Sequence, residues 1–192
     1  MSRIIAGSSG GRRIRMPPGG RTRPTTDRVR EALFSALTAW AGTSDRPPAE
    51  ALQGLAFCDL FAGSGAVGLE AASRGADPVL LVEVDARTAQ VAADNLRVVG
   101  LRAQIRTGRV EQLTSQPAVA PFDIVYADPP YELESGRVEA ILACLPQNGW
   151  VADDGLVVVE RSKRSAALAP PLGYTDVWTR TYGETQLVFC GR

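Results

Sequence analysis

The sequence predicts an α/β protein with a doubly wound, mostly parallel, Rossmann-like sheet that ends in an antiparallel strand pair. Short apolar runs typical of buried strands alternate with segments of helical period. A glycine-rich turn over residues 63–68 follows the first of these strands, as in nucleotide-binding α/β sheets. The last two apolar runs, 174–180 and 185–190, are joined by a tight turn at 182–184, which predicts antiparallel pairing.

The N-terminal part predicts a small hairpin and a helix. Two short strands, 3–7 and 12–16, flank a Ser-Gly turn, and prolines 17 and 18 end the second strand. Thr26 is a candidate N-cap for a helix from Asp27, in which positions 29, 33, 34, 37 and 40 form an apolar face. Residues 42–54 form a linker.

Strand and helix signals alternate through the remainder of the chain. Gly100 is a predicted helix stop. The expected elements are the strands 56–60, 78–84, 103–106, 122–127 and 155–160, and the helices 66–74, 86–99 and 137–145.

Charge is distributed unevenly in this chain of 192 residues, whose net charge is zero. Residues 1–30 hold eight arginines and one acidic residue, so they carry +7 and the remainder carries −7. A basic arm on an acidic body predicts a polyanionic partner. We therefore expect two parts, a hairpin over 1–24 that binds the polyanion and a catalytic domain over 25–192. The candidate contacts to the polyanion are Arg12, Arg13, Arg15, Arg21 and Arg23.

Several classes of protein are excluded by composition. The chain has no histidine, which removes histidine bases and most zinc chemistry. Its three cysteines are scattered, so we expect no disulfide framework, no metal site and a reducing cytoplasmic location. It has no run of 18 apolar residues and no apolar leader, so we expect no membrane partner. A single sheet of this size predicts a monomer.

The stretch 122–131 is the main catalytic candidate. A buried strand ends at Asp128-Pro129-Pro130-Tyr131, and the two prolines take the backbone out of the sheet at the edge where such sheets bind ligands. The Asp128 carboxylate and the Pro129 carbonyl can each accept an N–H bond from a planar amino group, which frees its lone pair for attack. Tyr131 can stack on the ring that bears the amino group. A simple proline-rich turn is the alternative interpretation.

The candidate cofactor loop follows the first core strand. Gly63, Gly65 and Gly68 spell G-x-G-x-x-G, and Glu83 ends the next strand, with Asp85 as a competing carboxylate. A nicotinamide site and an S-adenosylmethionine site share these features. A carboxylate before the loop, at position 59, favours a cationic sulfonium or ammonium and opposes a pyrophosphate.

With both motifs placed, the chain resembles the family of bacterial 16S ribosomal RNA guanine-N2 methyltransferases that modify guanine 966 of the small-subunit RNA. The resemblance runs nearly end to end and is most specific in the Arg-Pro-Thr-Thr-Asp-Arg-Val-Arg-Glu stretch at 23–31. The shared segments are 3–7, 23–31, 59–65, 68–71, 73–76 and 128–131.

This resemblance implies a Rossmann-like class I methyltransferase sheet, S-adenosylmethionine as cofactor, and 16S rRNA within an assembled or assembling small subunit as partner. It also implies that the N-terminal hairpin helps to bind RNA, so the five arginines named above become candidate RNA contacts. It implies that Asp59, Gly63 and Gly65 face the methionine part, and that residues 25–30 lie near it or near the target. Gly108 stands where the family usually carries Asp or Asn to bind adenine, so backbone groups of the next two residues are the expected replacement. The implied cofactor contacts are Asp59, Gly63, Ser64, Gly65, Glu83, Val84, Arg109 and Val110.

Alternatives remain at this point. The same chemistry serves adenine-N6 and protein-amide methyltransferases, although no large DNA-recognition insertion is visible and the glutamine enzymes usually carry Asn in place of Asp128. A nicotinamide-dependent oxidoreductase would share the glycine loop, but the chain lacks an evident second nucleotide half. A catalytically silent RNA-binding scaffold is the third alternative.

Overall fold

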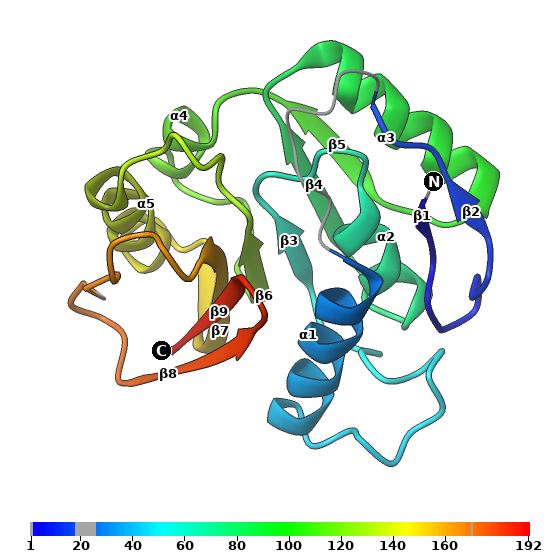
Figure 1. Cartoon of the computed structure of the whole chain (residues 1–192), viewed down its shortest axis with the longest axis horizontal. Coiled ribbons are helices and arrows are strands. Elements are labelled where there is room, and N and C mark those ends of the chain that lie inside the picture. The colour runs from blue at the N-terminus through cyan, green and yellow to red at the C-terminus, as the bar shows by residue number, and fades with distance from the viewer. Residues whose placement is uncertain (1, 18–25, 170) are drawn as a thin grey trace.

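The computed structural model describes residues 2–17, 26–169 and 171–192 (Figure 1). Within them, one sheet has seven strands in the order β5-β4-β3-β6-β7-β9-β8. Strands β3 to β7 run parallel, whereas β9 pairs antiparallel with both β7 and β8. Their bounds are β3 (Phe57–Asp59), β4 (Val79–Glu83), β5 (Gln104–Thr107), β6 (Phe122–Ala127), β7 (Val151–Ser162), β8 (Asp176–Tyr182) and β9 (Thr185–Gly191).

Helices cover both faces of this sheet, as Figure 1 shows. One face is covered by α1 (Asp27–Trp40), α2 (Ala66–Ser73) and α3 (Ala86–Val99). The opposite face is covered by α4 (Val110–Thr114) and α5 (Ser135–Gln147). The predicted doubly wound, mostly parallel sheet, with its antiparallel strand pair at the C-terminus, is confirmed.

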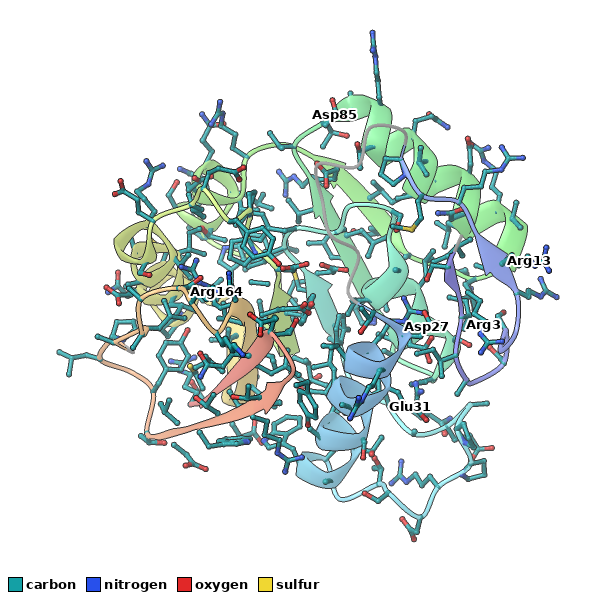
Figure 2. All side chains as sticks on the ribbon, viewed as in Figure 1. Arg3, Arg13, Asp27, Glu31, Asp85 and Arg164 are labelled. Carbon is teal, nitrogen blue, oxygen red and sulfur yellow. The ribbon has the colours of Figure 1, made fainter. Side chains whose placement is uncertain are left out.

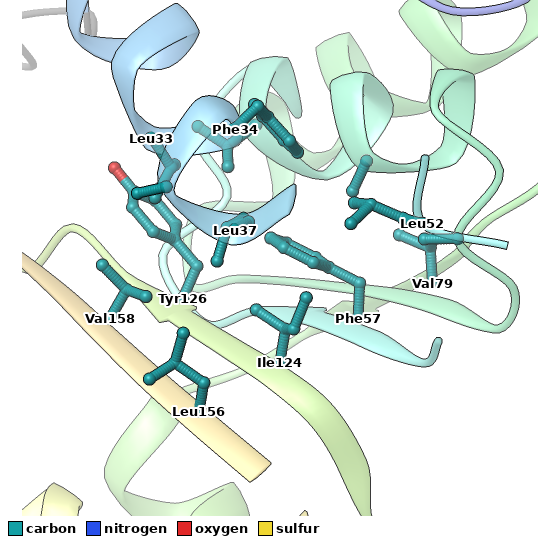
Figure 3. Close-up of a cluster of buried hydrophobic side chains, with 14 of the residues drawn as sticks. Leu33, Phe34, Leu37, Leu52, Phe57, Val79, Ile124, Tyr126, Leu156 and Val158 are labelled. Carbon is teal, nitrogen blue, oxygen red and sulfur yellow. The ribbon is translucent and has the colours of Figure 1, made fainter. Parts of the chain in front are cut away.

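Helix α1 is placed by its cap and by its apolar stripe. The Thr26 hydroxyl accepts the backbone N–H of Val29, as its position before the apolar pattern predicted. In Figure 3 the leucine and phenylalanine side chains of α1 lie over the sheet residues that form the core. These core residues are Leu33, Phe34 and Leu37 of α1 with Phe57, Ile124, Tyr126, Leu156 and Val158 of the sheet.

Two elements differ from the expectation. Strand β7 begins at Val151, before the predicted start at 155, because Val151 pairs with Phe122 ahead of a shift in register. The two exposed aspartates at 153 and 154 interrupt the apolar pattern there and conceal the pairing. The short helix α4 was not predicted, since five residues contain too few turns to show a helical period.

The N-terminal hairpin is present and shorter than predicted. It consists of β1 (Ser2–Arg3) and β2 (Arg13–Ile14), which pair antiparallel. Two of its three isoleucines pack with side chains of α2 and α3 in a small separate core. That core contains Ile4, Ile14, Leu69 and Val99, all fully or almost fully buried.

Buried charges also fix the hairpin on the domain. The Glu70 carboxylate accepts the backbone N–H groups of Ile5 and Ala6, at 2.6 and 3.0 Å, and the side chain of Arg74 at 2.8 Å. The fully buried guanidinium of Arg30 donates to the Arg3 carbonyl. The described hairpin residues therefore pack as part of the domain, and a functional division at residue 24 stays a prediction.

No helix in the described ranges has the length and apolar character needed to cross a membrane.

Candidate active site

Three neighbouring parallel strands each bring a carboxylate to the carboxyl edge of the sheet. Asp59 ends β3, Asp128 follows β6, and Glu160 lies near the end of β7. Each acid comes two residues after a residue of the hydrophobic core beneath α1. Side chains two residues apart point to the same face of a sheet, so all three acids lie on the face that α1 covers. Strands β3, β6 and β7 are adjacent, so the acids form one cluster.

Asp59 is 1% exposed, and its surroundings favour the neutral form. Burial raises the pKa of Asp59 to about 7, and the charges of Glu83 and Glu160 add to the rise. Backbone N–H groups of Gly68 and Phe61 act in the opposite direction. The Oδ2 atom accepts the Gly68 N–H at 3.1 Å, whereas Oδ1 is buried and has no hydrogen-bond partner among the described residues. A cation bound here would relieve both features.

Asp128 shows the same tendency at the end of β6. Burial, followed by the charges of Glu160 and Asp59, raises the pKa of the half-buried Asp128 carboxyl well above its usual range. Pro129 is buried and Pro130 is exposed, and the chain leaves the sheet at this point. Tyr131 is 61% exposed, an unusual state for a large ring, so a ring face is available at the site edge.

The glycines of the loop have separate roles. Gly63 has a positive φ of 54°, and a Cβ atom there would meet nothing within 4 Å, so the loop backbone is open to a ligand. Gly65 caps α2 in the left-handed conformation. Gly68 packs so closely on Leu81 that a Cβ atom would lie 2.0 Å from its Cδ2. Gly63 is therefore the glycine whose lack of a side chain leaves space for a cofactor.

Glu83 and Asp85, the two candidate carboxylates after β4, make different hydrogen bonds. The Glu83 oxygens accept the backbone N–H groups of Gly63 and Asp85, both at 2.9 Å. Asp85 caps α3 by accepting the Thr88 N–H at 2.8 Å. A hydrogen bond with the Thr88 side chain, followed by this backbone bond, lowers the pKa of Asp85. Figure 2 shows Asp85 on the outside of the molecule. Glu83 thus lies against the glycine loop, although its bond to ribose stays a prediction.

The other expected cofactor contacts line the same edge. Val84 is 58% exposed at the end of β4, as an apolar platform for a ring would be. Arg109 is exposed at the cap of α4, whereas Val110 is buried, so only its backbone is a candidate contact. Ser64 is buried, and its hydroxyl lies 3.5 Å from the sulfur of Met16. None of these assignments is tested by the geometry alone.

The arginines predicted to contact RNA differ in whether their side chains already bond within the protein. Arg13 and Arg15 are exposed on the hairpin, and Figure 2 shows Arg13 at its outer side. Arg12 is also exposed, but its guanidinium donates to the carbonyls of Val98 and Val99 at the end of α3. The remaining two candidates, Arg21 and Arg23, lie outside the described residues.

Part of the stretch at 23–31 has a structural role that the resemblance did not imply. Arg30 is 0% exposed, and burial lowers its pKa against the opposing charges of Glu70 and Asp27. Its guanidinium bonds to Asp27 at 3.0 Å and to the first residues of the hairpin. Thr25 lies outside the described residues. Arg30 therefore connects α1 to the hairpin.

Three residues near the site were not identified from the sequence. The buried amide of Asn95 joins the main chain of Arg15 to that of Ser64. Glu160 lies beside Asp128, as described above. Arg161 points to the other face, where it donates to the Leu133 carbonyl and the Ser135 hydroxyl and so holds the segment after Tyr131. The position of these three residues near the site can be recognised only when the order of the strands in the sheet is known.

The residues present fit a cationic, ring-bearing cofactor. Asp59 supplies a buried acceptor with no partner in the part of the chain that the structure describes, Gly63 supplies open backbone, and Val84 supplies an exposed apolar surface. Within the described ranges, no group of three or more Asp, Glu and Cys side chains is arranged to hold a metal ion.

Comparison with known proteins agrees with this geometry. The yhhF protein of Escherichia coli, solved as a candidate methyltransferase, superposes with a TM-score of 0.83 and 30% identity, covering 100% of this chain and 97% of its own. The 16S rRNA N2 methyltransferase of Thermus thermophilus, solved with AdoMet and guanosine, has the same fold, with a TM-score of 0.66 and 21% identity over 91% of this chain and 44% of its own. Fold and site together define an S-adenosylmethionine-dependent methyltransferase.

The family is shown by sequence. The profile described as "Conserved hypothetical protein 95" matches residues 2–191, and the chain belongs to this family. Ribosomal RNA small subunit methyltransferase D of Escherichia coli K12 is 34% identical over 174 residues, which are 90% of this chain and 81% of that protein. YlbH of Bacillus subtilis, named as a candidate rRNA methyltransferase, is 33% identical over 189 residues, 95% of each chain.

Proposed function

We propose that this protein transfers a methyl group from S-adenosylmethionine to the exocyclic N2 of a guanine in the 16S rRNA of the small ribosomal subunit, with guanine 966 as the expected position. The observation that carries the proposal is Asp128, followed by Pro129, at the end of β6 and beside Asp59. The relatives named as small-subunit rRNA methyltransferases support the RNA substrate. We further propose that the enzyme is a monomer that needs no metal ion.

The cofactor would be held along the edge formed by β3 and β4. Asp59 would face the methionine ammonium, Gly63 and Gly65 would allow the backbone to approach the ligand, and Glu83 would accept from the ribose hydroxyls. Val84 would lie against the adenine ring. When bound, S-adenosylmethionine supplies an activated methyl group on a cationic sulfur.

Asp128 and the Pro129 carbonyl would hold the target amino group by its two N–H bonds. This arrangement turns the nitrogen lone pair out of conjugation with the ring and directs it toward the methyl donor. Well-oriented proximity of this kind supplies roughly 7–11 kcal/mol of barrier reduction. N2 would become cationic once it carried the methyl group, with the donor sulfur left as a neutral thioether. Asp128 or water would then take the proton from N2, so no histidine is needed.

Tyr131 would hold the ring of the target base. A base that leaves its stack costs a few kcal/mol, and stacking on an aromatic side chain returns about 1–3 kcal/mol. The 61% exposure of Tyr131 supports this role, because the ring is accessible before RNA binds. Arg161 fixes the segment that follows the tyrosine and so supports the position of the ring.

The hairpin would bind the RNA backbone. Exposed Arg13 and Arg15 project from a hairpin that is fixed to the domain by buried bonds, so phosphate contacts there would set the register of the RNA. Arg12, Arg21 and Arg23 complete the proposed set of phosphate contacts.

The test is transfer of tritiated methyl from S-adenosylmethionine to small subunits that lack the modification, to naked 16S RNA and to duplex DNA, followed by nucleoside mass analysis. Label as N2-methylguanosine in the subunits is expected. Label as N6-methyladenosine would retain the chemistry and overturn the substrate. Absence of label with measurable cofactor binding would favour a protein substrate or a silent scaffold.

A further inference from the structure

The N-terminus of α5 follows the proposed target-binding segment and has no side-chain cap. Glu134 occupies the N-cap position, but its side chain makes no capping hydrogen bond. The Glu134 carbonyl accepts the N–H groups of Arg137 and Val138. The N–H groups of Ser135 and Gly136 have no hydrogen-bond partner among the described residues. Two backbone donors and the positive end of the dipole of a 13-residue helix therefore face outward at this point.

A buried guanidinium points at this helix end from β7. Arg161 is 9% exposed, and it follows Val159 by two residues, so it lies on the face of the sheet that α5 covers. Its Nη2 atom donates to the Ser135 hydroxyl at 3.0 Å, and its Nη1 atom donates to the Leu133 carbonyl at 3.2 Å. The Nε atom is buried and has no hydrogen-bond partner in the part of the chain that the structure describes.

The charge of Arg161 is not balanced by any carboxylate of the described residues. The other two buried arginines there, Arg30 and Arg74, both form ion pairs with Glu70. No such pair involves Arg161, and burial lowers the pKa of its guanidinium. A buried charge is costly unless it is paired, so an anion from outside the chain would stabilise this one.

This helix end lies next to the residues proposed to hold the target base. Strand pairing places Arg161 level with the first proline of the target-binding segment, at the carboxyl edge of the sheet. Tyr131 precedes Ser135 by four residues, which span at most about 14 Å. A hydrogen-bonded turn at 130–133 shortens that path. A nucleotide whose base reached Tyr131 would therefore have its backbone near the start of α5.

We propose that Arg161 and the backbone N–H groups of Ser135 and Gly136 bind one phosphate of the RNA backbone beside the target nucleotide. The inference rests on the proposed function and adds a phosphate site to the same active site. Guanidinium groups and helix N-termini both suit phosphate, and such contacts position the RNA without reading its sequence. The acids Glu132 and Glu134 of this segment are exposed, so solvent and salt screen their repulsion.

Gly136→Asp is the main test, because it separates folding from phosphate binding. A Cβ atom at Gly136 would meet nothing within 4 Å, and an acid in the first turn favours the helix. The variant should therefore melt no lower than the wild type. Its affinity for small subunits that lack the modification should nevertheless fall by roughly 5-fold or more at low salt, because the new carboxylate repels the phosphate. Gly136→Asn is the matched control, similar in size but uncharged, and should keep the wild-type affinity.

The role of the guanidinium is tested through the salt dependence of binding. Arg161→Met should flatten the log–log dependence of subunit affinity on salt by roughly 0.7–0.9, the value of one lost phosphate contact. Arg161→Lys keeps the charge and should retain most of the slope. One neutral methylphosphonate linkage beside the target nucleotide should weaken binding by the wild type and have little effect on Arg161→Met. If Arg161→Met fails to fold, the two Gly136 variants still decide the question.

An unchanged salt slope in Arg161→Met would overturn the proposal, and so would equal affinities of Gly136→Asp and Gly136→Asn. A different result would assign the site to a free anion and overturn the RNA assignment. In that case inorganic phosphate would protect the wild type but not Gly136→Asp against thermal unfolding, while both bound subunits equally. Failure of the proposed function is distinguished by nucleoside analysis, since the wild-type product would then contain no N2-methylguanosine.

Discussion

Asn95 holds the main chain of Arg15 by a pair of hydrogen bonds, although 80 residues separate them. The Arg15 N–H donates to Oδ1 at 2.7 Å, and Nδ2 donates to the Arg15 carbonyl at 2.9 Å. Nδ2 also donates to the carbonyl of Ser64 at 2.9 Å. One buried amide in α3 therefore joins the basic hairpin to the glycine loop.

Asn95→Ala should remove the hydrogen-bonded link between the basic hairpin and the glycine loop. Removal of the amide leaves two carbonyls and one N–H without their partner, at a cost of about 1–3 kcal/mol for each group left unsatisfied by solvent. We expect lower stability in denaturant unfolding, weaker RNA binding and weaker cofactor binding. Asn148→Ala is the matched control, because this half-buried amide bonds to Thr114 away from the hairpin. The link would be disproved if both variants changed the two affinities equally.

The raised pKa of Asp59 predicts pH-dependent cofactor affinity. Only the ionised carboxylate attracts the methionine ammonium, and Asp59 ionises with a pKa of about 7 next to the acids Glu83, Asp128 and Glu160. The affinity for S-adenosylmethionine should therefore rise between pH 6 and pH 8, with proton release on binding. Isothermal titration in two buffers of different ionisation enthalpy measures that release. Asp59→Asn should bind weakly with little pH dependence, and release as large as in the wild type would refute the assignment.

The same shift has the opposite effect on folding. A carboxyl whose pKa is raised in the folded state contributes fully to stability only at a pH below its unfolded pKa, near 3.9. That contribution to the free energy of unfolding is lost as the pH rises through the folded pKa, which for Asp59 is about 7. Asp59→Asn should therefore raise the melting temperature of the cofactor-free protein more at pH 8 than at pH 5. A pH-independent change in melting temperature would contradict this prediction.

Asp128→Ala should lose most turnover while cofactor binding is kept. The side chain is a proposed acceptor for the target amine and lies after the strand, so its truncation removes a polar contact without opening the apolar core. General acid–base groups typically contribute 10²–10⁴-fold to the rate, and a loss in that range is expected in single-turnover assays with saturating cofactor. Asp123→Ala serves as a control, since that carboxylate bonds to Ala56 at the opposite end of β6. Full activity of Asp128→Ala would remove it from the mechanism.

The sequence was sufficient to predict the fold because its signals are local. The cap at Thr26, the glycine turn and the strand that precedes Asp128 each depend on neighbouring residues, and the structure places these elements as expected. Asp59 and Asp128 could be identified for the same reason, because each belongs to a short motif.

Residues whose role depends on distant partners could not be identified in this way. Glu160 ends an ordinary apolar strand, and its place beside Asp128 depends on the order of strands in the sheet. Asn95 reads as one polar residue of an amphipathic helix, yet its partners lie in the hairpin and the glycine loop. Arg30 reads as one more charge of the basic arm, although it is buried against Glu70.

The hairpin arginines should act through phosphate contacts. Each lost contact should flatten the log–log dependence of RNA affinity on salt by nearly one unit, roughly 0.7–0.9. We expect this for Arg13→Ala and for Arg15→Ala, measured by filter binding between low and moderate salt. Arg180→Ala is the control, since it is exposed on β8 at the far edge of the sheet from β5. An unchanged slope in both hairpin variants would show that this surface is merely solvated.

Tyr131 should act through its ring and not through its hydroxyl. The side chain is 61% exposed, so its replacement opens no cavity and any loss of activity reports on substrate contact. Tyr131→Phe keeps the stacking surface and should stay active. Tyr131→Ala should lose about 1–3 kcal/mol of base stacking, which is a 5- to 150-fold rise in the KM for RNA with cofactor affinity unchanged. Equal rates for the two variants would argue that the target base is held elsewhere.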